Sequence, residues 1–297
     1  MQLTSNVMDT ALIFEGGGMR GAYTAAVVTT LLQTGLHFNY VAGISAGSSH
    51  TVNYVSRAPE RARRSFVDFA DDPRFGSWWT WLQGKGMFNA KYIYERVPLP
   101  DGVLPLDFDT FRANPADYRI GGFDVDAGET VFWTRDDVHE VLDLMRRVRA
   151  SSSIPLVMPP VMIDGRMYVD GALGAGGGIP LGVAQRDGFT KFFVVLTRER
   201  EYVKEPYRHP RAWHAYYRKH PAIADGILGR AAAYNAVREE LFELERAGRA
   251  VVFFPEHMTV ENRTHDVAAL QAAYDAGLDQ ARRELPRWKE FLGVGVG

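Results

Sequence analysis

A serine stands between two glycines where a short apolar run meets a helical pattern. The segment Gly43–Gly47 reads GISAG, with Ser45 at its centre, and it overlaps the end of the apolar run Tyr40–Ile44. Glycines permit the sharp turn that lifts a serine off the end of a sheet, and the following helix offers backbone N–H groups to developing negative charge. The same pattern also fits a structural turn. We interpret Ser45 as the candidate nucleophile of an acyl-transfer reaction.

A run of glycines precedes this serine. The segment Glu15–Gly21 reads EGGGMRG and follows the apolar residues Ala11–Phe14. Acyl transfer needs hydrogen-bond donors aimed at the oxyanion, and consecutive glycines bring backbone N–H groups close to a substrate. We expect Gly17 and Gly18 to be the main donors. Arg20 either anchors this loop through an ion pair or contacts an anionic head group.

The glycine run also contains the pattern G-x-G-x-x-G, which is typical of dinucleotide-binding folds. Such a fold needs an acidic residue about 20 positions further on to bind the ribose hydroxyls. No Asp or Glu occurs between Gly21 and Glu60, and no Gly-Lys-Ser/Thr follows the glycines as a phosphate-binding loop would require. The sequence therefore disfavours a nucleotide, and we expect no metal or organic cofactor.

A serine hydroxyl is a weak nucleophile until a neighbouring base takes its proton, and the usual base is a histidine held by a carboxylate. His50 lies on the same predicted helix as Ser45, about 140° around it, so we expect it to point elsewhere. His257 and His265 follow a strand-like segment, so a Ser-His-Asp esterase that uses one of them is an alternative. The α/β-hydrolase fold of such an esterase forms several strands before its nucleophile, whereas Ser45 follows only the second predicted strand. This order of strands argues against the histidine alternative.

Asp170 is the better candidate for the base. It follows the predicted strand Met167–Val169, which pairs with Pro160–Ile163 in a hairpin whose turn is Asp164-Gly165. This position fixes the carboxylate on a rigid element, and apolar surroundings would raise its proton affinity toward that of a base at neutral pH. An Asp before Gly is also common in Asx turns, and we assign that structural role to Asp164.

The elements that must position these residues alternate between strand and helix. Helical periodicity follows each of the first two strands, over Ala22–Leu32 and Ala46–Val55. A helix is predicted over Asp136–Arg149 and a further buried strand over Lys191–Thr197. Two buried parallel strands at the N-terminus indicate an α/β fold. Beyond residue 200 the pattern becomes mostly helical.

The composition is that of a globular protein. The chain has 297 residues, of which 46% are hydrophobic and 24% charged, so it can bury a substantial core. The net charge of -2 gives no basic excess for a phosphate backbone, so we expect no nucleic-acid partner. The first residues lack a basic leader region, and no apolar run approaches the ~18 residues of a spanning helix. We expect a cytoplasmic protein.

Together and in this order, the segments EGGGMRG, GISAG and YVDGA closely resemble the motifs of the patatin-like phospholipases. The segment RASSSIPLVMPP, Arg149–Pro160, is similar to a further block of that family. The resemblance covers residues 11 to about 182. The sequence departs from the family pattern at Glu15, where aspartate is frequent, and at Gly174–Gly178, which replaces a more polar segment.

The resemblance implies a fold and a reaction. The fold is a three-layer α/β/α arrangement with a mainly parallel sheet, with residues 1–200 as the catalytic domain and residues 201–297 as a mostly helical C-terminal extension. The reaction is carboxylic ester hydrolysis in a phospholipid or another acyl lipid, of the phospholipase A or lysophospholipase type, with Ser45 as nucleophile and Asp170 as base. The oxyanion loop consists of Gly16, Gly17, Gly18 and Met19. A lipid-binding or regulatory protein without turnover is the alternative outside the enzymes.

Two aromatic segments are candidates for lipid contact. The first carries Trp78, Trp79 and Trp81, flanked by Phe75 and Phe88. Its residues follow neither a helical nor a strand period. Tryptophan favours the boundary between apolar and aqueous surroundings, so this segment either contacts acyl chains and the membrane interface or packs into the core. The second is the basic and aromatic stretch from residue 202 to residue 219, which either meets anionic head groups at a membrane surface or forms a solvated helix face.

Overall fold

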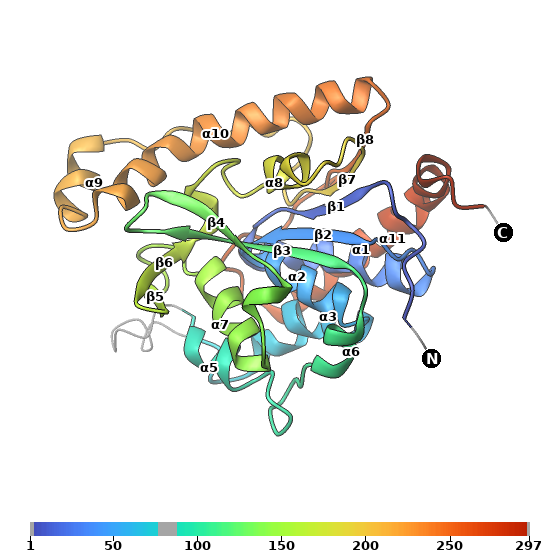
Figure 1. The fold of residues 1–297 in the computed structure, drawn as a ribbon, viewed down its shortest axis with the longest axis horizontal. Coiled ribbons are helices and arrows are strands. Elements are labelled where there is room, and N and C mark those ends of the chain that lie inside the picture. The colour runs from blue at the N-terminus through green and yellow to red at the C-terminus, as the bar shows by residue number, and fades with distance from the viewer. Residues whose placement is uncertain (1–2, 77–87, 296–297) are drawn as a thin grey trace.

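The computed structural model of the chain describes residues 3–76 and 88–295 (Figure 1). Within these residues one sheet has the strand order β5-β6-β3-β2-β1-β7-β8, and β4 pairs with β3 outside this path. The strands are β1 (Ala11–Phe14), β2 (Tyr40–Ile44), β3 (Asp117–Asp124), β4 (Glu129–Trp133), β5 (Val161–Ile163), β6 (Arg166–Asp170), β7 (Phe192–Val195) and β8 (Ala250–Phe253).

The centre of the sheet is parallel. β1 pairs in parallel with β2 and β7, β2 pairs in parallel with β3, and β7 with β8. Only the β3–β4, β3–β6 and β5–β6 pairs are antiparallel in the described chain. The central strands β1 and β7 are buried along their whole length, as continuous apolar strands covered on both faces should be. The predicted mainly parallel sheet is confirmed.

Helices cover both faces of this sheet (Figure 1). Alternate residues of β1 point to opposite faces, so Leu12 and Phe14 pack in one core and Ala11 and Ile13 in the other. The predicted three-layer α/β/α fold is therefore confirmed. The larger core contains residues of α1 (Gly21–Gln33), α2 (Ala46–Val55), α3 (Pro59–Phe66), α5 (Ala90–Glu95), α6 (Phe108–Ala113), α7 (Val141–Ser151) and α11 (Val267–Leu292). The opposite core contains residues of α8 (Leu181–Arg186) and α10 (Pro221–Arg246).

The last third of the chain completes both layers and the sheet. β8 extends the sheet beyond β7, α10 lies over one face, and α11 packs against α1 on the other (Figure 1). Gly277 of α11 lies so close to α1 that a Cβ there would stand 2.3 Å from the carbonyl oxygen of Tyr23. The division at residue 200 stays a prediction.

One predicted helix boundary was wrong. The helix expected from Asp136 begins at Val141, and a short 3₁₀ turn, Arg135–Asp137, precedes it. The side chain of Thr134 caps this turn, and Glu140 begins a second capping box that opens α7. Two capping signals so close together start two separate elements, and the acidic residues that suggested the helix start, Asp136 and Asp137, belong to the 3₁₀ turn.

Candidate active site

Two strands end against each other on one edge of β3, and this places Ser45 beside Asp170. β4 occupies one edge of the second half of β3, so both β2 and β6 must use the other edge. β2 runs parallel to β3 and ends with Ile44 opposite Gly121, whereas β6 runs antiparallel and ends with Asp170 opposite Gly122. The C-terminal ends of β2 and β6 therefore lie opposite two adjacent residues of β3.

The side chains of Ser45 and Asp170 form a direct hydrogen bond. Ser45 Oγ donates to Asp170 Oδ2 at 2.7 Å, and the two residues are only 5% and 2% exposed. The other carboxylate oxygen, Oδ1, accepts the backbone N–H of Ala172 at 2.8 Å, which fixes the rotation of the carboxylate. The structure thus brings together the hydroxyl and the carboxylate that the sequence analysis proposed as a pair.

The backbone at Ser45 is strained. Its φ of 57° and ψ of -126° lie outside the regions that residues with a side chain prefer. The glycines on either side allow this turn to pack tightly: a Cβ on Gly43 would stand 2.1 Å from the carbonyl oxygen of Gly47, and one on Gly47 would stand 2.2 Å from that of Phe14. The sharp turn predicted from GISAG is therefore the observed geometry.

Ser151 holds this turn in place, and the sequence analysis did not assign it a role. Its Oγ accepts the backbone N–H of Ser45 at 2.8 Å and donates to the carbonyl oxygen of Gly121 at 2.5 Å. The residue belongs to the RASSSIPLVMPP block, so a signal for it existed in the sequence. Only the folded structure shows that this block contacts the backbone of Ser45.

Replacing Ser151 by alanine is expected to destabilise the protein. The substitution leaves the buried N–H of Ser45 and the carbonyl oxygen of Gly121 without their partner, at a cost of about 1–3 kcal/mol in the free energy of unfolding. Chemical denaturation should show a lower midpoint at unchanged slope, and ester cleavage should fall because the turn loosens. A midpoint and activity equal to those of the wild type would show that the bridge is dispensable.

Burial raises the pKa of the Asp170 carboxyl above its usual value. The Arg230 guanidinium, the hydrogen bond from Ala172 and the hydrogen bond from Ser45 oppose this shift. A carboxylate that gains proton affinity from burial, and that already accepts the serine proton as a hydrogen bond, has the properties of a general base.

The glycine loop passes directly beside the serine. A Cβ on Gly16 would stand 2.9 Å from the Cβ of Ser45, so only glycine lets the loop lie this close. Gly18 adopts a φ of 57° and lines the cavity that contains Ser45. A substrate carbonyl at Ser45 would therefore lie against this loop.

The amides of the four predicted oxyanion-loop residues are used differently. Those of Gly16 and Met19 donate to backbone carbonyls of other loops, at 3.0 and 3.1 Å. Across residues 3–76 and 88–295, the amides of Gly17 and Gly18 donate to no acceptor. Of the four amides, those of Gly17 and Gly18 therefore remain available to an oxyanion in the described chain, and these are the two that the sequence favoured as main donors. The role of the loop as an oxyanion hole stays a prediction.

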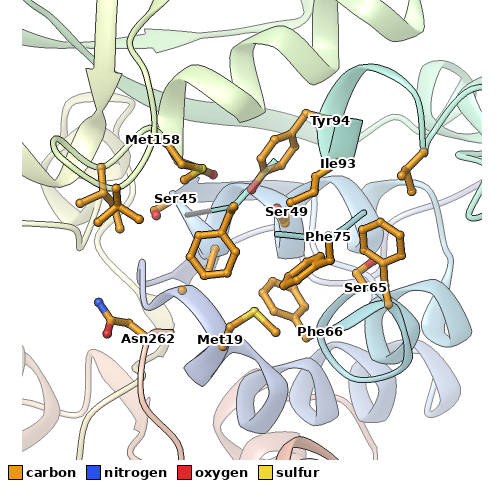
Figure 2. Close-up of a pocket in the computed structure, with 18 of the residues that line it drawn as sticks. Met19, Ser45, Ser49, Ser65, Phe66, Phe75, Ile93, Tyr94, Met158 and Asn262 are labelled. Carbon is orange, nitrogen blue, oxygen red and sulfur yellow. The ribbon is translucent and has the colours of Figure 1, made fainter. Parts of the chain in front are cut away.

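Ser45 faces a largely apolar cavity (Figure 2). Tyr94 of α5 points its hydroxyl into this space toward Ser45 and Ser49, and burial raises the pKa of this phenol. Phe75 and Phe88, at the two ends of the aromatic segment considered above, also line the cavity. Further apolar residues on its wall are Met19, Val52, Phe66, Phe69, Ile93, Val97, Leu104, Met145, Ile154, Val157 and Met158.

The other residues predicted to contact lipid are Arg20, three tryptophans and the segment 202–219. Arg20 is buried and donates through Nε to the carbonyl oxygen of Thr197 at 3.1 Å, so it anchors the loop through a carbonyl. Desolvation lowers its pKa, with a smaller contribution from Arg198. Trp78, Trp79 and Trp81 lie outside the described residues. The segment 202–219 includes α9 (Pro210–Tyr216), where Tyr216 is exposed, and its contact with a lipid surface stays a prediction.

No histidine is among the hydrogen-bond partners of Ser45 or Asp170 in the described part of the chain. His50 is buried with its Nε2 2.9 Å from Thr24 Oγ1, and burial lowers its pKa to about 3, so it stays neutral. His257 is exposed, and the ring of His265 stacks on Phe88 with 5.2 Å between centroids.

Fold and site together define a class of α/β/α proteins in which a serine at a strand end faces a carboxylate, a glycine loop and an apolar cavity. The chain belongs to the patatin-like phospholipase family, because the sequence model of that family matches residues 12–185. Members of this family are lipid acyl hydrolases. A second model, a domain of unknown function (DUF6363), matches residues 220–293.

Individual relatives are distant. The chain is 26% identical over 194 residues to the uncharacterized protein YjjU of Escherichia coli, covering 63% of this chain and 51% of that protein. It is 26% identical over 178 residues to the lysophospholipase NTE1 of Mycosarcoma maydis, covering 55% of this chain and 8% of that protein. The crystal structure of VipD from Legionella pneumophila aligns with a TM-score of 0.49 at 12% identity, covering 94% of this chain and 67% of VipD. The chain thus spans about half of one curated relative and a small part of the other.

None of the described helices is both long enough and apolar enough to cross a bilayer. The cytoplasmic location expected from the sequence stays a prediction.

Proposed function

We propose that the protein hydrolyses carboxylic esters of lipids through an acyl intermediate on Ser45, with Asp170 as the base. The observation that carries this proposal is the 2.7 Å hydrogen bond from Ser45 Oγ to Asp170 Oδ2, together with the apolar cavity that Ser45 lines. Family membership and the availability of the Gly17 and Gly18 amides support it. The proposed substrate is a glycerophospholipid or a lysophospholipid.

The proposed reaction has two halves. In the first, Asp170 takes the proton of Ser45 Oγ while the oxygen attacks the ester carbonyl, and the amides of Gly17 and Gly18 stabilise the oxyanion. The alcohol leaves with the proton from Asp170, and the acyl group stays on Ser45. In the second, Asp170 takes a proton from water, the hydroxide attacks the acyl-serine, and the proton returns to Ser45 as the fatty acid leaves. The apolar cavity holds the acyl chain during both halves.

Fatty-acid release by the purified protein tests this proposal. Mixed vesicles of diacyl and lysoglycerophospholipids, together with p-nitrophenyl esters, should yield free fatty acid and p-nitrophenol. The wild type should turn over many times, which separates a hydrolase from a lipid-binding protein. If the folded protein binds lipid but releases no acid from any of these esters, the hydrolase proposal is wrong and the binding alternative stands.

The pH profile should report Asp170. A protonated carboxyl cannot accept the serine proton, so kcat/KM should fall about tenfold per pH unit below the pKa of this group. Because burial raises that pKa above 3.8, the fall should begin at a higher pH than an ordinary aspartate would give. The measurement is kcat/KM against pH within the range where the protein stays folded. An acid limb that vanishes in His257→Ala or His265→Ala would instead favour a histidine base.

A further inference from the structure

The cavity at Ser45 runs along one face of α2 toward an arginine. Ser45, Ser49 and Val52 all line it, and their spacing places them on the same side of the helix. Arg61 of α3 lines the same cavity. Its Nη1 donates to the side-chain oxygen of Asn53, the residue that follows Val52 on α2. The guanidinium therefore stands beside the far half of α2, away from the nucleophile.

Within residues 3–76 and 88–295, Arg61 makes no ion pair with an Asp or Glu. Its described acceptors are two neutral oxygens, the Asn53 side chain and the carbonyl of Leu104. Desolvation alone lowers its pKa to about 10, so it is a cation at neutral pH. Residues 77–87, outside the described part, contain no Asp or Glu. A desolvated charge without a counter-charge costs free energy, and a bound anion would offset that cost.

The distance along α2 indicates which part of a substrate could supply the anion. Eight positions separate Ser45 from Asn53, which is ~12 Å along a helix. The phosphate of a glycerophospholipid lies only a few bonds from either ester, ~5 Å away, so it cannot reach Arg61 while the ester is at Ser45. The far end of an extended acyl chain of about nine or ten carbons can reach it.

We propose that the cavity favours acyl chains of medium length that end in a carboxylate, with Arg61 binding that terminal group. The inference rests on the proposed function, because Ser45 must cleave the ester at the near end of the chain. Water and the half ester then give a dicarboxylate and the alcohol, and the terminal carboxylate itself does not react. The apolar wall contacts the methylene groups between the two ends, and the guanidinium group of Arg61 pairs with the terminal carboxylate.

Two p-nitrophenyl esters of equal chain length test this proposal, the decanoate and the half ester of decanedioic acid. The wild type should prefer the half ester in kcat/KM, and Arg61→Met should lower this preference about 10- to 100-fold. Arg64→Met on the exposed side of the same helix is the matched control and should keep the wild-type ratio. If the wild type cleaves the decanoate and shows no higher kcat/KM for the half ester, this proposal is wrong and the hydrolase proposal stands. If neither ester is cleaved, the hydrolase proposal itself fails.

A binding measurement removes the dependence on turnover and on the folding of an Arg61 variant. Calorimetric titration of Ser45→Ala with monomethyl decanedioate and with methyl decanoate at pH 8 compares the two chain ends directly, because both ligands carry the same ester at the other end. Monomethyl decanedioate should bind at least about tenfold more tightly, because only it carries a carboxylate for Arg61. Equal or tighter binding of methyl decanoate would contradict the role of Arg61.

Discussion

Asp170→Asn is expected to lower kcat for ester cleavage by at least ~10³-fold while the protein stays folded, because the amide cannot accept the proton of Ser45 Oγ. The amide can still accept that hydroxyl as a hydrogen bond, so the geometry at 2.7 Å should survive. The measurement is steady-state cleavage of p-nitrophenyl decanoate. Activity above about a tenth of the wild type would show that another group is the base.

Asp164→Asn is the matched control for this variant. Asp164 also precedes a glycine in the same hairpin, but its side chain is 87% exposed and its φ is 50°, a conformation that asparagine tolerates. Its activity should equal that of the wild type. The pair of variants thus separates loss of the base from general disturbance of the hairpin.

Thermal stability gives an independent check on Asp170. Because burial raises its pKa, the native state favours the protonated carboxyl, and this relative stabilisation is lost as the pH rises through the native pKa. Asparagine carries no charge and avoids this loss. The Asp170→Asn variant should therefore be at least as stable as the wild type at pH 8, and any advantage should shrink in acid.

Ser45→Ala should abolish turnover, with a loss of roughly 10³- to 10⁶-fold, because it removes the hydroxyl on which the proposed acyl intermediate forms. The variant should still bind lipid, since the cavity wall is unchanged. Initial rates with p-nitrophenyl decanoate measure the loss. Ser56→Ala, a buried serine at the other end of α2, is the control and should retain activity.

The same assay separates the dyad from a histidine mechanism. His257→Ala and His265→Ala should keep kcat within a few-fold of the wild type, because neither ring contacts Ser45 or Asp170 in the described structure. A loss in either variant as large as that in Ser45→Ala would restore the Ser-His-Asp alternative. Near-wild-type activity in both histidine variants thus supports the Ser45–Asp170 pair.

Local sequence signals predicted the elements that carry the site. β1, β2 and α2 have the bounds that their apolar periodicity indicated. Asp164-Gly165 adopts φ values of 50° and 79°, as a two-residue hairpin turn requires. These features depend on residues close in sequence, so a single chain contains the information for them.

The meeting of the two strand ends depends on pairing that no local signal encodes. Whether Asp170 faces Ser45 is set by the register of β6 on β3, and a slip of one residue would turn its side chain to the other face of the sheet. The motif resemblance suggested the pair, but the sequence could not show that β2 and β6 share one edge of β3. The bridging role of Ser151 depends on the same packing and was missed for that reason.

The cavity was also beyond prediction. Its wall comes from α2, α3, α5, α7 and several loops, each of which contributes only a few residues. Such a wall has no period, and an arginine such as Arg61 looks like an ordinary charged residue of an amphipathic helix until the fold shows what it faces.

The most direct test of the dyad is the site and rate of labelling by a fluorophosphonate. Peptide mass spectrometry should place the phosphonyl adduct of the wild type on Ser45, and Asp170→Asn should label at least ~100-fold more slowly, because the reagent reacts only with an activated serine. An adduct on a different residue, or equal labelling rates in the wild type and Asp170→Asn, would contradict the account.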